Sequence, residues 1–254
     1  MNDQVKIIAH RGASAEAPEN TMAAFRRALD SGADMIELDV HLSKDDSIIV
    51  MHDQSVNRTT NGKGQIGELT YDEIRKLDTG EWFGPEFKGE KVPTLADVFE
   101  CAIGKKILLI ELKWSRKGIY AGLADKVIDV INKYDATGWV IIQSFETKYL
   151  EEIQMKAPEI TLHQLLFGYS DLLPVYYDTK LHLKKFRPLP FVKSVNCYFR
   201  FAGSSKINEW HEMKKEVFVY TIDKPSQIIK AASFGTDGII TNNPRLALEV
   251  LKRK

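Results

Sequence analysis

The sequence predicts a single α/β domain, a (β/α)8 TIM barrel with a small inserted subdomain after the second strand. The chain has 254 residues, the usual size of such a barrel. Eight short apolar runs rich in β-branched residues alternate with amphipathic segments. The main structural alternative is a doubly wound open sheet, which normally has a glycine-rich phosphate loop after its first strand. No such loop is present, so the barrel is favoured.

Each predicted strand is four to six residues long and apolar enough to be buried on both faces. The strands are expected at residues 5–9, 35–40, 107–112, 140–143, 161–165, 194–197, 217–221 and 238–241. Apolar residues with helical spacing predict helices between most of them. These helices are expected at residues 20–31, 123–134, 208–215, 226–232 and 245–251.

One stretch breaks this alternation after the second strand. A polar turn at residues 43–46 followed by an apolar run at 47–51 predicts a hairpin or a strand extension. Residues 57–93 are then rich in glycine and too long for a barrel loop without a function. We interpret them as an insertion with one short helix at 71–77, capped by Thr70, within one domain covering residues 1–254.

The composition excludes several classes of protein. The 35 basic and 35 acidic residues give a formal net charge of zero, so a dedicated nucleic-acid binder is not expected. No apolar window is long enough for a membrane span, and the first residues do not resemble a secretory signal. A cytoplasmic location is therefore expected. Cys101 and Cys197 are too few and too isolated for a disulfide framework or a cysteine metal site.

Two carboxylates end the second predicted strand. Glu37 and Asp39 are two residues apart, so their side chains point to the same face of the strand. Two like charges at close range resist joint ionisation unless a cation or a shared proton lies between them. For this pair alone, a site for a hard divalent cation and a pair neutralised by nearby Arg or Lys remain equally open.

The third predicted strand ends with the same spacing, in Glu111 and Lys113. If this strand pairs with the second one, Glu111 lies near Glu37 and Asp39. Three carboxylates with one lysine beside them are what a divalent cation and an anionic ligand require. The alternative is an ion-pair network at the mouth of the barrel.

Two histidines follow strands at the same mouth. His10 comes directly after the first strand, where barrel enzymes place catalytic groups, and is followed by Arg11, whose planar fork matches a phosphate. His52 follows the run at 47–51 and can form an acid/base pair with His10. Tyr220, near the end of the seventh strand, is a candidate for the lining of the mouth. The other histidines are expected to be surface or hydrogen-bonded residues.

Taken together and in order, these motifs resemble the glycerophosphodiester phosphodiesterases. The similarity is dense in the first half of the chain and thin from about residue 168 to 208. It rests on HRGASAEAPENT at 10–21, GADMIELDVHLSKDDSIIVMHD at 32–53, RKLDTGEWFGPEFKGEKVPTLADVF at 75–99, LLIELK at 108–113, VYTIDKP at 219–225 and GTDGIITNNP at 235–244. It implies a barrel enzyme that hydrolyses glycerophosphodiesters to sn-glycerol 3-phosphate and an alcohol.

The resemblance also implies a role for each motif residue. His10 and His52 match the catalytic pair of the family. Glu37, Asp39 and Glu111 match its metal ligands. The implied cofactor is therefore one divalent cation, and Ca²⁺, Mg²⁺ and Mn²⁺ are all compatible with three carboxylates. Phosphate-contacting positions are matched by Arg11 and Lys113.

Two residues depart from the family pattern. Tyr220 stands where many relatives have a tryptophan, at a position associated with the glycerol side of the pocket. Asn242 stands where an aspartate is common, and we interpret its segment as a helix cap. The implied mechanism has His10 as general base and His52 as general acid, with either water or the glycerol 2-hydroxyl as the nucleophile.

Two other functions remain as alternatives. A phospholipase-type phosphodiesterase acting on intact lipid requires an exposed apolar rim, and no long apolar loop in the sequence fits one. The basic residues 184–187 are interpreted as a solvated face, although Tyr176 and Tyr177 nearby also fit contact with lipid. A catalytically silent, phosphodiester-binding barrel is expected to lack a histidine or a carboxylate, and all are present. The sequence makes no prediction of the oligomeric state.

Overall fold

Eight parallel strands close into a barrel in a computed structural model that describes residues 5–170 and 173–253. Each neighbouring pair is hydrogen-bonded, and β1 pairs with both β14 and β2 to close the ring. The predicted TIM barrel is therefore confirmed. Around the ring the strands are β1 (Lys6–Ala9), β2 (Met35–Leu42), β4 (Ile107–Leu112), β7 (Val140–Ser144), β8 (Thr161–Leu166), β12 (Ser194–Tyr198), β13 (Glu216–Tyr220) and β14 (Gly238–Thr241).

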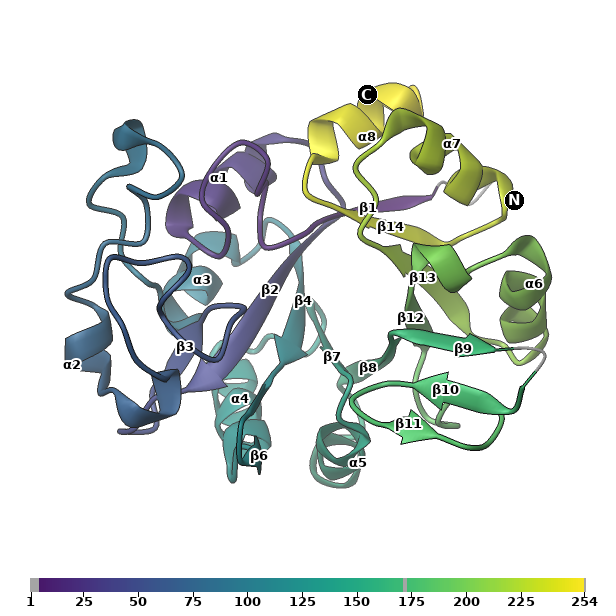
Figure 1. Cartoon of the computed structure of the whole chain (residues 1–254), viewed down its shortest axis with the longest axis horizontal. Helices are drawn as coiled ribbons and strands as arrows, with labels where there is room; N and C mark the ends of the chain where they lie inside the picture. The colour runs from purple at the N-terminus through teal and green to yellow at the C-terminus, as the bar shows by residue number, and fades with distance from the viewer. Residues whose placement is uncertain (1–4, 171–172, 254) are drawn as a thin grey trace.

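Helices lie outside this ring of strands (Figure 1). They are α1 (Met22–Asp30), α3 (Leu95–Ala102), α4 (Leu123–Lys133), α5 (Thr147–Lys156), α6 (Ser204–Glu212), α7 (Pro225–Ser233) and α8 (Pro244–Val250). Five were predicted, although α6 begins four residues before its predicted start. The helices α3 and α5 were missed. A capping box of Thr94 and Asp97 begins α3, a local signal that was available in the sequence.

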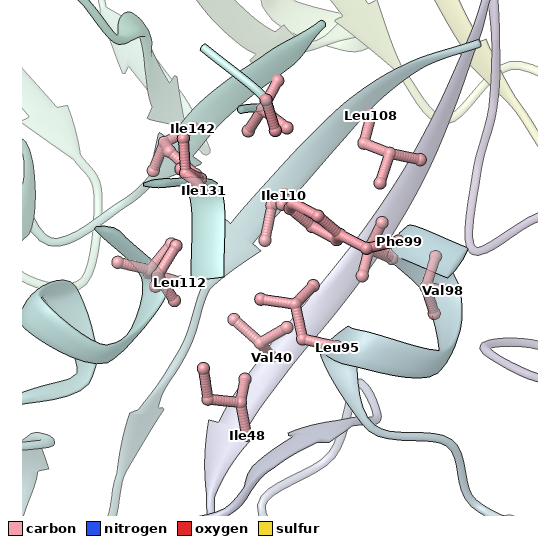
Figure 2. Close-up of a cluster of buried hydrophobic side chains, with 14 of the residues drawn as sticks. Val40, Ile48, Leu95, Val98, Phe99, Leu108, Ile110, Leu112, Ile131 and Ile142 are labelled. Carbon is pink, nitrogen blue, oxygen red and sulfur yellow. The ribbon is translucent and has the colours of Figure 1, made fainter. Parts of the chain in front are cut away.

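Alternation along the strands divides the core into two layers. On β2 and β4 the even-numbered residues face outward and are buried under the helices. Figure 2 shows Leu95 and Phe99 of α3 packing toward Val40 of β2 and Ile110 of β4. Inside the barrel, an apolar layer made of Ile8, Met35, Leu109, Ile141, Phe218 and Ile240 fills the amino-terminal half. The next inward positions toward the carboxyl ends of β2 and β4 are polar.

The chain between β2 and α3 follows the sequence prediction. β3 (Ile48–Val50) pairs antiparallel with β2, which confirms the hairpin. The segment beyond it contains η1 (Ile66–Glu68), α2 (Tyr71–Ile74) and η2 (Pro85–Phe87), and α2 is capped by Thr70 as expected, although it ends earlier than predicted. A small apolar cluster that includes Ile49, Val56 and Ile66 stabilises this segment. The assignment of residues 1–254 to one domain stays a prediction.

Two small antiparallel sheets at the carboxyl ends of the barrel strands were not predicted. β5 (Trp114–Ser115) and β6 (Gly118–Ile119) form a hairpin after β4. After β8, a three-stranded sheet contains β9 (Gly168–Ser170), β10 (Val175–Tyr177) and β11 (Leu181–His182). Strands of two or three residues are too short to give a recognisable period in sequence.

Within the described ranges, none of the helices has the length and apolarity needed to cross a bilayer, in agreement with the sequence. Residues 1–4, which belong to the segment used to exclude a secretory signal, lie outside the described residues. The cytoplasmic location stays a prediction.

Candidate active site

A cavity of about 650 Å³ opens at the carboxyl ends of the barrel strands. Its volume is in the range typical of small-molecule sites. Asp39 is fully buried behind the lining. The seven other site residues predicted from the sequence all line the cavity, and they are His10, Arg11, Glu37, His52, Glu111, Lys113 and Tyr220.

The three carboxylates converge as the strand pairing predicts. Asp39 of β2 lies opposite Glu111 of β4 in the ladder, and one oxygen from each of Glu37, Asp39 and Glu111 lies within 4.8 Å of the others. The Lys113 ammonium lies 2.9 Å from Asp39 Oδ1 and 2.5 Å from Glu111 Oε1. The four groups therefore form one tight charge cluster, in which each residue is at most 6% exposed.

Burial and mutual repulsion divide the protons unequally in this cluster. Burial, reinforced by the charges of Asp39 and Glu111, raises the pKa of Glu37 well above its usual value. Burial also raises the pKa of Glu111, although Lys113 opposes the rise. For Asp39 the nearby cations, led by Lys113, outweigh burial and lower the pKa. The cluster thus lacks positive charge when only protein groups are present.

The donor set of this cluster fits a hard divalent cation. Asp39 Oδ1 and Glu111 Oε1 are buried and have no hydrogen-bond donor with acceptable geometry among the described residues, even though the Lys113 ammonium lies within ion-pair distance of both. Carboxylate oxygens without a donor, grouped at short range, are the ligands that Ca²⁺, Mg²⁺ and Mn²⁺ prefer. Glu37, Asp39 and Glu111 are thus able to hold a metal ion.

Arg11 is held against the same carboxylates by a strained turn. Its own φ is +55° and that of Gly12 is +80°, and a Cβ on Gly12 would lie only 2.7 Å from Ala24, so no larger residue fits there. The turn directs the Arg11 amide toward Glu37 Oε2, to which it donates at 2.9 Å. The guanidinium donates to Glu19 at 2.8 Å, and its Nε lies 3.5 Å from Asp39 Oδ2.

His10 is oriented by Asn242, so the segment does cap α8 as expected but Asn242 itself has a different role. The cap of α8 is Asn243, whose side chain accepts from Leu246. Asn242 Nδ2 donates to Asp223 at 2.7 Å, so its Oδ1 faces His10 and accepts from Nδ1 at 2.7 Å. The imidazole therefore carries its proton on Nδ1 and leaves Nε2 with a lone pair. Burial and the charge of Arg11 lower the pKa of His10 to about 4.

His52 has an anionic partner instead. Its Nδ1 lies 2.8 Å from Asp53 Oδ1, and Asp53 also accepts two hydrogen bonds from Arg58. The hydrogen bond from His52, together with those from Arg58, keeps the pKa of Asp53 well below its usual range despite partial burial. Arg58 donates in turn to Glu19, which links His52 to Arg11 through a chain of charged groups.

Several residues of the site were missed from the sequence. Gln143 lies opposite Glu111 on β7 and donates to Glu37 at 3.2 Å. Its signal was available, because it is also a polar residue near the end of a buried strand. Asn20 donates to Asp39 at 2.8 Å and was interpreted only as a helix start. Its role depends on a turn with φ +56° that no local pattern predicts.

The side of the cavity formed by β8, β12 and β13 is aromatic. Tyr220 donates its hydroxyl to the Leu166 carbonyl at 2.9 Å, so its ring and not its hydroxyl faces the cavity. Phe145, Phe167 and Tyr198 continue this side. Phe167 and Tyr198 are 36% and 43% exposed. No long apolar loop in the sequence fits an exposed rim, but the structure forms one from the rings of several separate segments.

Comparison with known proteins agrees with this geometry. The model of the glycerophosphoryl diester phosphodiesterase family matches residues 10–246. A glycerophosphodiester phosphodiesterase of Caldanaerobacter subterraneus subsp. tengcongensis is 37% identical over 97% of this chain and 98% of its own length. Among solved structures, a phosphodiesterase of Oleispira antarctica in complex with the product sn-glycerol-3-phosphate has a TM-score of 0.85 at 25% identity, covering 97% of this chain and 96% of that one. An Agrobacterium tumefaciens glycerophosphodiester phosphodiesterase has a TM-score of 0.77 at 29% identity, covering 97% and 100%.

The barrel, its polar mouth and these relatives together define a hydrolase of phosphoric diesters. The chain belongs to the glycerophosphoryl diester phosphodiesterase family.

Replacement of Asn20 tests how much the cluster depends on its polar support. Asn20→Ala is expected to lower the free energy of unfolding by about 1–3 kcal/mol, because it removes a donor to buried Asp39 and puts alanine into a left-handed turn that asparagine tolerates better. Asn20→Gly is the matched control, since glycine adopts this turn without strain but also lacks the amide. Urea denaturation of both variants separates the two effects. Wild-type stability of Asn20→Gly would show that the contact with Asp39 contributes nothing.

Proposed function

We propose that this chain hydrolyses glycerophosphodiesters to sn-glycerol 3-phosphate and an alcohol, using one divalent cation and two histidines. One observation carries the proposal. Two histidines with differently charged partners border the same cavity as three converging carboxylates. The product complex of the Oleispira antarctica relative supports the proposed substrate class.

The partners of the two histidines suit opposite roles. His10 faces a neutral amide and lies near Arg11, so it stays neutral at pH 7 with a free lone pair on Nε2, the form that a general base needs. His52 faces the Asp53 carboxylate through Nδ1, and an anionic partner of this kind suits the residue that protonates the leaving alcohol. A neutral partner thus suits the base and an anionic partner suits the acid.

The phosphate would be held by positive groups around the carboxylate cluster. Arg11 and Lys113 would contact its non-bridging oxygens, because both line the cavity and both carry donors. A divalent cation held by Glu37, Asp39 and Glu111 would neutralise charge on the phosphate and orient it. Attack by water and attack by the glycerol 2-hydroxyl, followed by opening of the cyclic phosphate, both remain compatible with this arrangement.

Removal of divalent cations is expected to abolish the activity. After treatment with a chelator, the protein should release no glycerol 3-phosphate from glycerophosphocholine, and Ca²⁺, Mg²⁺ or Mn²⁺ added singly should restore release. Glu111→Gln should weaken binding of the restoring metal about 100-fold or more, measured by calorimetry. Glu151→Gln, on the exposed face of α5, is the control. Full activity in chelator would contradict the metal requirement, and no release with any metal would contradict the proposed function.

A substrate with an activated leaving group separates the two histidines. His10→Ala should slow hydrolysis of both glycerophosphocholine and a nitrophenyl ester of glycerol phosphate by about 100-fold or more. His52→Ala should slow the first reaction by a similar factor and the second much less, because a good leaving group needs little protonation. Steady-state kcat for both substrates checks this. Equal losses for His52→Ala would overturn its assignment as the acid.

Burial and the charge of Arg11, which keep His10 neutral, set the acidic limit of the activity. A base must be unprotonated, so kcat/KM should fall as the pH drops through about 4, the pKa of His10. Asn242→Asp places a carboxylate at Nδ1 of His10 and favours the imidazolium. The fall in kcat/KM at low pH, the acid limb of the pH profile, should therefore move up by about one pH unit or more. Ser14→Ala removes another hydrogen bond to Asn242 Oδ1 without adding charge and should leave the limb in place. An unmoved limb in Asn242→Asp would contradict the role of His10 as base.

A further inference from the structure

A second cavity of about 400 Å³ lies between the three-stranded sheet and η3 (Phe199–Phe201). We call it the apolar groove. Most of its lining is aromatic, from Phe167, Tyr169, Tyr176, Tyr177, Tyr198 and Phe201, and Leu181 and Val175 are among the other residues that line it. Among the residues that the structure describes, neither carboxylates nor cationic side chains line the groove, so its chemistry differs from that of the catalytic cavity.

The apolar groove is continuous with the catalytic cavity. Phe167 and Tyr198 line both of them. From the catalytic side, the ring of Tyr198 lies 6.2 Å from that of Tyr220 and 6.3 Å from that of Phe201. On the other side of the junction, Phe167 stacks on Phe145 at 4.1 Å and lies 5.4 Å from Tyr177. An apolar path therefore leads from the catalytic centre to the outer sheet.

The apolar residues along this path have unusually large exposed fractions. Tyr177 is 47% exposed, Phe201 41% and Leu181 66%. Soluble proteins rarely expose contiguous apolar area of this kind unless it binds something. Since the groove shares Phe167 and Tyr198 with the catalytic cavity, a ligand that covers it is placed to reach the reacting phosphate as well. This points to an apolar part of the substrate itself.

The position of the groove selects one end of the substrate. β12 lies four strands from β2 in either direction around the ring, so the groove is across the barrel from the hairpin that carries His52. Figure 1 shows the sheet of β9–β11 on the opposite side from α2 and the insertion. The leaving alcohol must face His52, the proposed acid. The groove therefore receives the end that bears the glycerol.

We propose that the apolar groove binds a single hydrocarbon chain attached to the glycerol of the substrate, so that the enzyme also hydrolyses glycerophosphodiesters with one acyl chain. This inference rests on the proposed function. Water supplies the oxygen of the new P–O bond, the bond from phosphorus to the headgroup oxygen breaks, and the headgroup alcohol leaves with a proton. The products are a chain-bearing glycerol phosphate and the free alcohol. One groove accommodates one chain, so two-chain phospholipids are not the expected substrates.

Substrates of graded chain length test this proposal in the full-length, metal-loaded protein. The series is glycerophosphocholine without a chain and with acyl chains of increasing length on the glycerol, each below its micelle concentration. We expect kcat/KM to rise about twofold per added methylene, less than full burial of each would give, because the groove is open on one side. Mass spectrometry should detect the acylated glycerol phosphate. A flat or falling series would overturn the inference.

Two further comparisons identify which end of the substrate the groove binds. A diester with the chain on the alcohol part should show no gain in kcat/KM, and a gain there that exceeds the gain on the glycerol would overturn the assignment. Leu181→Ser and Phe201→Ala are tested separately. Each should reduce the gain in kcat/KM that the longest chain brings, relative to the substrate without a chain, at least threefold. Ile229→Ser, at an equally exposed apolar residue on α7, is the matched control and should keep the full dependence.

The outcomes also separate this inference from the proposed function. If glycerophosphocholine without a chain is not hydrolysed with any metal, the proposed function fails. If it is hydrolysed and the chain brings no gain, only the chain-binding groove fails. The ratio of kcat/KM with and without a chain is measured within each variant, so a loss of folded protein does not affect the result.

Discussion

The burial of three carboxylates beside one lysine is the constraint on which the mouth of the barrel depends. Glu37, Asp39 and Glu111 cannot all be ionised away from water unless positive charge lies among them. Lys113 and Arg11 supply two charges against three, and the raised pKa of Glu37 reflects the remaining deficit. A divalent cation would reverse this deficit and leave the site positive toward a phosphodiester. The zero net charge of the whole chain therefore conceals a local charge pattern suited to an anion.

The barrel makes this burial possible because its strands separate two environments with a period of two. On β2 and β4, outward residues such as Leu38 and Ile110 stabilise the fold against the helices, while inward residues are apolar below and polar at the carboxyl end. The polar partners come from loops that the barrel holds in place, as when Asn20 reaches Asp39. The site can thus contain costly charges without weakening the layer under the helices, since the two layers share no side chains.

Which residues of the site could be predicted from the sequence depends on how regular their contacts are and how far apart the partners lie along the chain. Glu37, Asp39 and Glu111 were predictable because strand alternation and the pairing of neighbouring strands are regular. The hydrogen bond between His10 and Asn242 joins residues 232 positions apart, and no periodic pattern in the sequence predicts it. A local pattern also cannot separate Asn242 from Asn243, so the right segment was assigned to the cap but Asn242 was given the wrong role. The aromatic rim escaped notice for a similar reason: its rings come from separate loops and become a surface only when the barrel closes.

The two sides of the mouth together orient a substrate. On the side of β1, β2 and β4 the groups are charged, and the proposed acid His52 lies there with Asp53. On the side of β8, β12 and β13 the lining is aromatic, and the hydroxyl of Tyr220 is occupied by a backbone carbonyl. A diester with a phosphate in the middle can place only one end against each side. If His52 protonates the departing oxygen as proposed, the end that faces His52 would leave and the end that faces the aromatic rings would keep the phosphate. The asymmetry of the lining would thus decide which ester bond breaks, before any specific contact with the headgroup is considered.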